Sequence, residues 1–174
     1  MPRKPKHERK SPGDRVTSFI QSGFEKTELL PDHELQPQIF RYETPDIGER
    51  HKAFTRLCLT DIMLGGVQII EAGGENTLHN HAAQDGFYYV LKGRLRFYGE
   101  GDVVLCELGP HEGIAVPRGY KYWHAAVGDE PVELLQVIAF DRSRPNKHKN
   151  FGAPAKKENT SEIRIFDAET PRSV

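Results

Sequence analysis

The sequence predicts an all-β domain, a barrel or sandwich of about eight to ten strands. From about residue 53 to residue 140, short runs rich in Val, Ile, Leu and aromatic residues alternate with turns that contain Gly, Pro or Asp. No stretch of useful length with the period of an amphipathic helix interrupts this region. The 174 residues include 16 Gly and 12 Pro, so the chain fits one domain with many tight turns.

The expected strands can be justified in order along the chain. FTRLCLTD alternates apolar and polar residues, which is typical of a half-buried strand. MLGGVQIIEAGG follows, broken by Gly65-Gly66 and closed by Gly73-Gly74. The remaining strands are expected at TLHNHA, FYYVLKG, RLRFYGEG, VVLCELG, GIAVPRG, YWHAAVGDEP and VELLQVIAFD. Since no internal repeat occurs, we predict a single barrel.

Four segments are expected from the composition. Residues 1–15 form a basic, flexible tail, and residues 16–52 form an N-terminal arm with a short helix at VTSFIQSGF and a strand at QIFRYE. The barrel occupies residues 53–141. Residues 142–174 form a flexible C-terminal extension with one short strand at EIRIFD. The basic tail could touch an anionic partner, although a solvated tail is the simpler interpretation.

Charge and hydropathy exclude several classes of partner. The formal net charge of -1 gives no overall field that would attract nucleic acid or an anionic membrane. No apolar run approaches the length of a membrane span, and no apolar segment follows the basic N-terminus as in a secretory signal. Cys58 and Cys106 lie in apolar runs and are expected to be buried free thiols. We therefore expect a cytoplasmic protein.

The stretch HNHAAQDGFYYVLKG contains the first candidate metal ligands. His79 and His81 point to the same face of a strand, because side chains alternate along it. Two imidazoles on one face can converge on one ion. Taken alone, such a pair is weak evidence, since it also arises by chance on exposed strands.

Two motifs around this pair resemble those of the cupin superfamily. Gly73, five residues, His79-x-His81 and the later Gly93 resemble the first cupin motif. HEGIAVPRGYKYWHAAVGDEP resembles the second motif and contains its Pro-x-Gly core at residues 117–119. The resemblance implies a cupin β-barrel, a jelly-roll-like double-stranded β-helix. It also implies a cavity that binds a small-molecule substrate and a divalent transition metal such as Fe, Zn, Ni, Mn or Cu.

Two positions depart from the family pattern. Gly86 stands where the family usually has a glutamate ligand, so that Gln84 or Asp85 would have to reach the metal through a bulge. In the second motif the family histidine falls at Tyr122, whereas this chain has His124 two residues later. Both residues face the same side of a strand, but they lie roughly 6.6 Å apart along it.

Three ligand sets remain open at this point. His79, His81 and His124 could form a three-histidine site with open positions, the arrangement of a catalytic metal. Gln84 or Asp85 could add a fourth ligand. Alternatively, the barrel could have lost the metal and kept its cavity for binding only.

Four other residues are candidates for the site. Tyr88 and Tyr122 could hydrogen-bond a substrate or a metal-bound water, although core packing is the commoner role of such residues. Arg96 shares the face of Tyr88 if the intervening turn is regular, and it could bind an anionic substrate, although an exposed surface position is the stronger interpretation. His111 adds an unexpected imidazole near the second motif. We interpret the remaining histidines as solvent residues: His7, His33, His51 and His148.

The resemblance favours a metal-dependent enzyme that acts on a small polar substrate. A ligand set without glutamate leaves the charge of the ion uncompensated, which favours an anionic substrate. Dioxygenase chemistry is the first hypothesis, and a sugar-acid isomerase or lyase is the second. A non-catalytic binding or sensing module is the alternative, and nucleic-acid binding through the basic tail is a third. We expect a homodimer that pairs through the QIFRYE arm.

Overall fold

The computed structural model describes residues 15–16, 37–145, 147–151 and 164–169. Nearly all of the predicted basic tail and of the predicted helix at VTSFIQSGF lie outside these residues; Arg15 and Val16, which are described, form a strand. The limits of the four predicted segments stay predictions.

The described chain is built of strands and contains no α-helix, which confirms the all-β class. It has no helix long and apolar enough to cross a membrane. The large sheet has seven strands in the order β1 (Arg15–Val16), β12 (Arg164–Asp167), β2 (Lys52–Leu59), β3 (Met63–Ile70), β10 (Val132–Phe140), β5 (Gln84–Lys92) and β8 (Gly113–Val116). A three-stranded sheet contains β7 (Val104–Leu108), β6 (Leu95–Tyr98) and β9 (Trp123–Ala126), with a short 3-10 turn at Glu100–Asp102. β4 (His79–His81) pairs with β11 (His148–Asn150).

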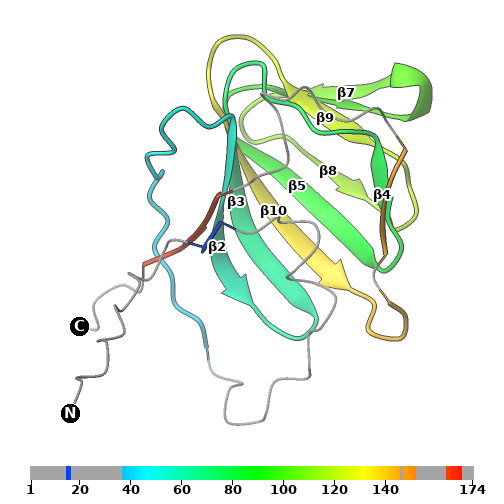
Figure 1. Cartoon of the computed structure of the whole chain (residues 1–174), viewed down its shortest axis with the longest axis horizontal. Helices are drawn as coiled ribbons and strands as arrows, with labels where there is room; N and C mark the ends of the chain where they lie inside the picture. The colour runs from blue at the N-terminus through cyan, green and yellow to red at the C-terminus, as the bar shows by residue number, and fades with distance from the viewer. Residues whose placement is uncertain (1–14, 17–36, 146, 152–163, 170–174) are drawn as a thin grey trace, which may run out of the picture.

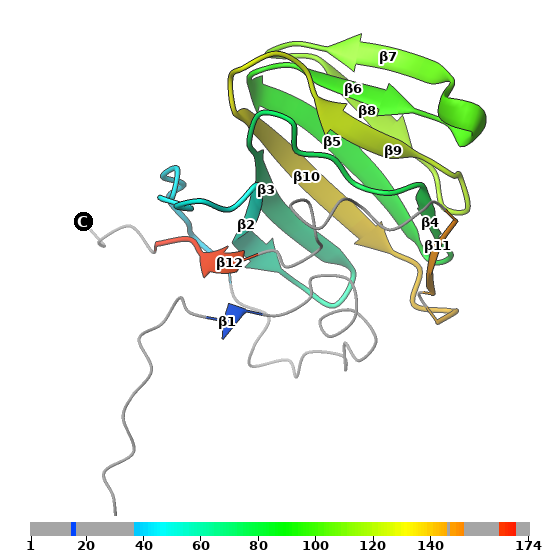
Figure 2. The same cartoon turned by 45° about the horizontal axis from the view of Figure 1, so that its top comes forward.

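The sheets face each other as the two walls of a barrel. β6, β7 and β9 lie across from β10, β5 and β8, and β4 closes the side between them (Figures 1 and 2). Neighbouring strands are antiparallel except β12, which runs parallel to β2. The core fills the space between the walls, and its most deeply buried members are Phe54, Ile70, Val90, Leu95, Phe97, Val132 and Leu134.

Alternation along β5 shows how the sequence fixes the two faces of the large sheet. Tyr88 and Val90 are buried in the core, whereas Phe87 and Leu91 on the other face are exposed. The same alternation on β6 buries Leu95. Alternation with a period of two residues thus correctly predicts which side chains of these strands enter the core.

The N-terminal arm differs from its prediction. QIFRYE forms no strand, because its one backbone pairing with another described residue is a single bridge between Arg41 and Glu169. Ile39 and Phe40 consequently stay 68% and 43% exposed. The predicted strand at EIRIFD is confirmed as β12. The homodimer expected to form through the arm stays a prediction.

β11 is a strand that the sequence did not predict. It lies in the polar run DRSRPNKHKN, which has no apolar alternation to mark a strand. Its three residues pair with β4, with His148 opposite His81 and Asn150 opposite His79. The two strands lie side by side in both views (Figures 1 and 2).

Cys58 and Cys106 are free thiols, as expected, but are only half-buried.

Candidate metal centre

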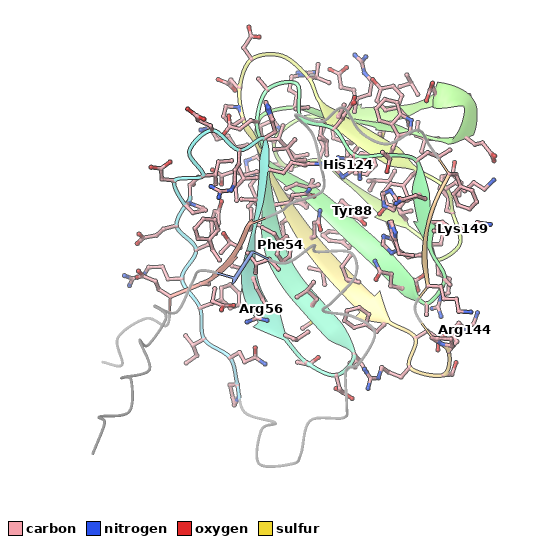
Figure 3. All side chains as sticks on the ribbon, in the orientation of Figure 1. Phe54, Arg56, Tyr88, His124, Arg144 and Lys149 are labelled. Atoms are coloured by element: carbon pink, nitrogen blue, oxygen red, sulfur yellow. The ribbon has the colours of Figure 1, made fainter. Side chains whose placement is uncertain are left out.

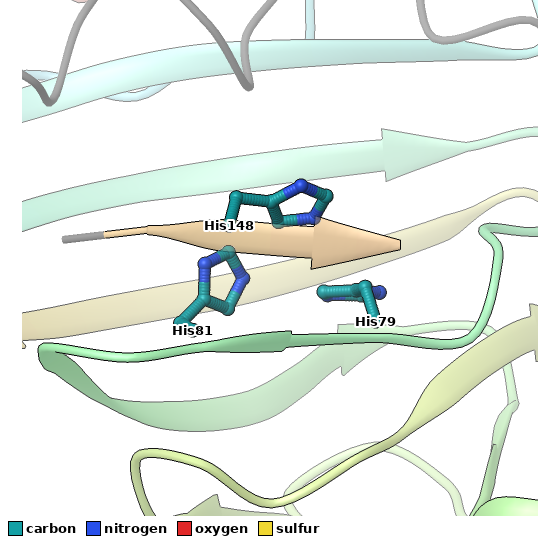
Figure 4. Close-up of side chains that lie close together, drawn as sticks. All are labelled: His79, His81 and His148. Carbon is teal, nitrogen blue, oxygen red and sulfur yellow. The ribbon is translucent and has the colours of Figure 1, made fainter. Parts of the chain in front are cut away.

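Strands β4 and β11 bring three imidazoles together. His79 and His81 point to one side of β4, and His148 faces them from β11 (Figure 4). The ring centroids form a nearly equilateral triangle, with separations of 5.0 Å for His79–His81, 5.0 Å for His79–His148 and 4.9 Å for His81–His148. One ring nitrogen from each residue lies within 4.8 Å of the others. The sequence-based interpretation of His148 as a solvent residue is therefore wrong.

Hydrogen bonding fixes which nitrogen of His79 is available. Its Nδ1 lies 2.6 Å from the backbone oxygen of Thr77. Because a carbonyl oxygen can only accept, Nδ1 carries the proton and Nε2 keeps its lone pair. A hydrogen bond of this kind is the usual support of a metal-binding histidine. Nδ1 of His81 is buried and has no hydrogen-bond partner among the described residues.

The three imidazoles are neutral at physiological pH. Burial lowers the pKa of His79 to about 4. Burial, with the nearby His79 and His148, lowers the pKa of His81 to about 2. Burial also lowers the pKa of His148. Each imidazole would therefore offer a metal one nitrogen with a free lone pair, and no imidazolium would have to lose a proton first.

This donor set fits a divalent transition metal. Imidazole nitrogens suit Zn, Fe, Ni and Cu, and three protein ligands leave positions open for water or substrate. Nitrogens bound to one tetrahedral ion at roughly 2.1 Å are about 3.4 Å apart. The three ligand nitrogens, now up to 4.8 Å apart, would have to move closer together when an ion binds.

His124, which the sequence analysis gives as a candidate third ligand, is not part of this group of nitrogens. It lies in the core on β9, with its ring 5.2 Å from that of Phe97 (Figure 3). The residue that bridges to His79 across the strands is Tyr122. His124 therefore lies two residues farther along β9, a step of roughly 6.6 Å. The structure replaces His124 by His148 as the third imidazole.

Comparison with known proteins agrees with this fold. Residues 66–138 match the protein family described as "Cupin domain". This segment is a cupin domain.

Solved structures with the same fold share little sequence with the chain. A Klebsiella pneumoniae protein with a double-stranded beta-helix domain has a TM-score of 0.56 at 17% identity, over 73% of this chain and 100% of that chain. The cupin domain of Cnp3 from Schizosaccharomyces pombe has a TM-score of 0.51 at 22% identity, over 58% of this chain and 69% of that chain. KdgF from Halomonas sp. has a TM-score of 0.50 at 17% identity, over 60% of this chain and 96% of that chain. The curated proteins contain no match.

The position of the usual cupin glutamate is filled by a tyrosine ring. A Cβ atom added to Gly86 would lie 2.5 Å from Cε2 and 2.7 Å from the hydroxyl oxygen of Tyr88. The hydroxyls of Tyr88 and Tyr122 are 2.5 Å apart, and the ring of Tyr122 lies 4.6 Å from that of His79. Burial raises the pKa of Tyr88 to about 12 and that of Tyr122 well above its usual value. Two protonated phenols thus occupy the cupin positions of a glutamate and a histidine.

No bulge turns Asp85 toward the imidazoles, and a ligand role of Gln84 stays a prediction. Strand β5 pairs with β10 in unbroken register from Gln84 to Gly86, so Asp85 keeps the outward direction. Its carboxylate forms an ion pair with Arg118 at 2.7 Å and accepts the backbone N–H of the same residue. The hydrogen bonds from Arg118 lower the pKa of Asp85. Gln84 is buried at the start of β5.

Arg96 and His111 lie away from the imidazoles. The prediction that Arg96 shares the inward face of Tyr88 is wrong, because Leu95 and not Arg96 enters the core after the turn at Gly93. The guanidinium of Arg96 instead binds Glu107 at 2.6 Å. His111 is an exposed turn residue with a positive φ of 70°, and its Nδ1 lies 3.5 Å from the hydroxyl of Tyr89.

Proposed function

We propose that this cupin domain is a metal-dependent enzyme whose ion is held by His79, His81 and His148. The observation that supports it best is the triangle of three neutral imidazoles with ring centroids about 5 Å apart. The tautomer fixed by Thr77 and the unpartnered Nδ1 of His81 agree with a ligand role. A bound divalent metal would supply Lewis acidity or redox chemistry at the open positions.

The proposed substrate is a small organic anion. The three imidazoles are uncharged, and neither Gln84 nor Asp85 brings a negative charge to them. The charge of a divalent ion would therefore remain uncompensated by its protein ligands, and a carboxylate or enolate would bind best.

We place dioxygenase chemistry first among the reactions. Three protein ligands leave open positions for an organic substrate and for oxygen at the same centre. A sugar-acid isomerase or lyase is the second candidate, and the hydrogen-bonded phenols of Tyr88 and Tyr122 support it. Because their raised pKa values keep both phenols protonated, the pair would serve as hydrogen-bond donors that orient a substrate beside His79.

Oxygen consumption separates these candidates. Protein loaded with Fe²⁺ would be incubated with a panel of small carboxylates and diketones in air and under nitrogen. A dioxygenase consumes oxygen with one substrate of the panel and converts no substrate under nitrogen. An isomerase or lyase converts its substrate in both atmospheres. The His148→Ala variant should lose the activity, and His111→Asn, which alters an exposed turn that tolerates Asn, should keep it.

A binding or sensing module is the competing function. If the metal-loaded protein converts no compound of the panel in either atmosphere but binds one of them stoichiometrically, the enzymatic proposal is wrong. The same metal centre would then serve recognition.

A further inference from the structure

Lys52, the first residue of β2, carries a buried positive charge that the proposed metal centre does not use. The residue is only 5% exposed, although lysine is among the residues least often buried. Its Nζ donates a hydrogen bond to the backbone oxygen of Glu75 at 2.6 Å. Burial lowers the pKa of Lys52, and the negative charge of Glu75 raises it. Among the described residues Nζ has no second acceptor and no carboxylate at ion-pair distance, so N–H groups of Lys52 remain available there for a ligand.

The loop after β3 places this ammonium next to His124. Glu75, which accepts the hydrogen bond from Lys52, forms a backbone bridge with Ala125. The following residue, Asn76, accepts a hydrogen bond from the backbone N–H of His124 at 2.6 Å. Lys52 and His124 are thus hydrogen-bonded to two adjacent residues of the same loop. Both side chains point to the inside of the barrel.

His124 has an unused ring nitrogen at this place. The residue is 2% exposed, and its Nδ1 has no hydrogen-bond partner among the described residues. Burial, together with the charges of His79 and Lys52, lowers its pKa to about 3. The nearby charge of Lys52 also acts on His79. A buried cation and a buried unpartnered ring nitrogen therefore lie on the His79 side of the imidazole triangle.

We propose that Lys52 and His124 form an anion subsite that holds a carboxylate or similar oxyanion of the substrate. The free N–H groups of Lys52 would donate to the oxyanion, and the imidazole of His124 would donate through a protonated ring nitrogen. The other end of the substrate would then reach the triangle of His79, His81 and His148. The inference rests on the proposed function for its substrate, but the subsite belongs to residues that bind no metal.

The subsite can be tested with acetate as the anionic probe and acetamide as its neutral counterpart. Calorimetric titrations would use the full-length protein, with and without Zn²⁺. Wild-type protein should bind acetate and not acetamide. Lys52→Met and Lys52→Gln should both weaken acetate binding about 10- to 100-fold, as expected for the loss of a charge-assisted hydrogen bond. Lys52→Gln keeps a donor for Glu75, so a purely structural role of Lys52 would leave it unaffected.

Lys92→Met serves as the matched control, because Lys92 is exposed at the far end of β5. It should bind acetate like the wild type. The proposal is overturned if the wild type does not distinguish acetate from acetamide, or if Lys52→Gln folds and binds acetate with unchanged affinity. Failure of Zn²⁺ to bind the wild type would contradict the metal centre alone, since the titrations without metal still report on Lys52.

Discussion

Gly86 is the residue that most clearly separates this site from the usual cupin pattern. It removes a carboxylate and also makes room for the ring of Tyr88, whose hydroxyl binds that of Tyr122. A side chain at position 86 and the present position of Tyr88 exclude each other. The absent glutamate is thus part of the packing around the site.

The substitution Gly86→Ala tests this packing. Its Cβ would lie 2.5 Å from the ring of Tyr88, so the ring must move and the hydrogen bond to Tyr122 must weaken. We expect a loss of about 1–3 kcal/mol in the free energy of unfolding, measured by urea denaturation. Gly109→Ala is the control, because its Cβ meets only an ordinary contact at 3.6 Å. Equal stability of the two variants would contradict the packing argument.

At single residues, the sequence predicted half of the centre. The common direction of His79 and His81 follows from alternation on one strand, and Gly86 shows that the family glutamate is missing at that position. The exchange of His124 for His148 could not be predicted, because it depends on which strand lies against β4. Local periodicity gives the direction of a side chain but not its neighbour across the barrel.

At the scale of elements, the decisive pairing is that of β4 with β11. Residues 142–151 looked like a polar extension, and only the long-range register places His148 opposite His81. The pairing is short and is extended at its ends by two hydrogen bonds, from the N–H of Ala82 to the oxygen of Lys147 and from the N–H of Phe151 to the oxygen of Leu78. Since three residues give little backbone pairing, a metal shared by both strands should hold β11 in place.

Hydrogen exchange can measure this effect. Saturating Zn²⁺ should slow the exchange of the Ala82 and Phe151 amides at least about tenfold relative to protein in chelator, because opening of β11 would cost a metal ligand. The Gly99 amide, which binds Val103 in the distant β6–β7 hairpin, is the internal control. In the His148→Ala variant the response to Zn²⁺ should vanish. Identical exchange with and without metal in the wild type would refute a shared ion.

At the scale of the whole molecule, the barrel buries several imidazoles in neutral form. The folded-state pKa values are about 4 for His79, about 2 for His81 and about 3 for His124, against 6.5 for an unperturbed histidine. Between these values and about pH 6.5 the unfolded chain binds more protons than the folded one. The stability of the metal-free protein is therefore present above about pH 6.5 and falls as the pH drops below it.

Urea denaturation of the metal-free protein from about pH 7 to about pH 5 tests this sign. Each buried imidazole should remove up to about 1.4 kcal/mol of unfolding free energy per pH unit below about pH 6.5. The His124→Gln variant should show a shallower decline, and His111→Asn should follow the wild type. A flat profile over this range would show that the imidazoles are protonated as easily in the folded protein as in the unfolded chain.

If the metal ligands come from β4 and β11, the affinity for Zn²⁺ must depend on His148 and not on His124. Equilibrium dialysis followed by elemental analysis would compare the wild type with His148→Ala, His124→Gln and His111→Asn. We expect one Zn²⁺ per chain in the wild type and a loss of affinity of more than about 100-fold in His148→Ala. His124→Gln and His111→Asn should bind like the wild type. Wild-type affinity in His148→Ala, with loss in His124→Gln, would contradict the account.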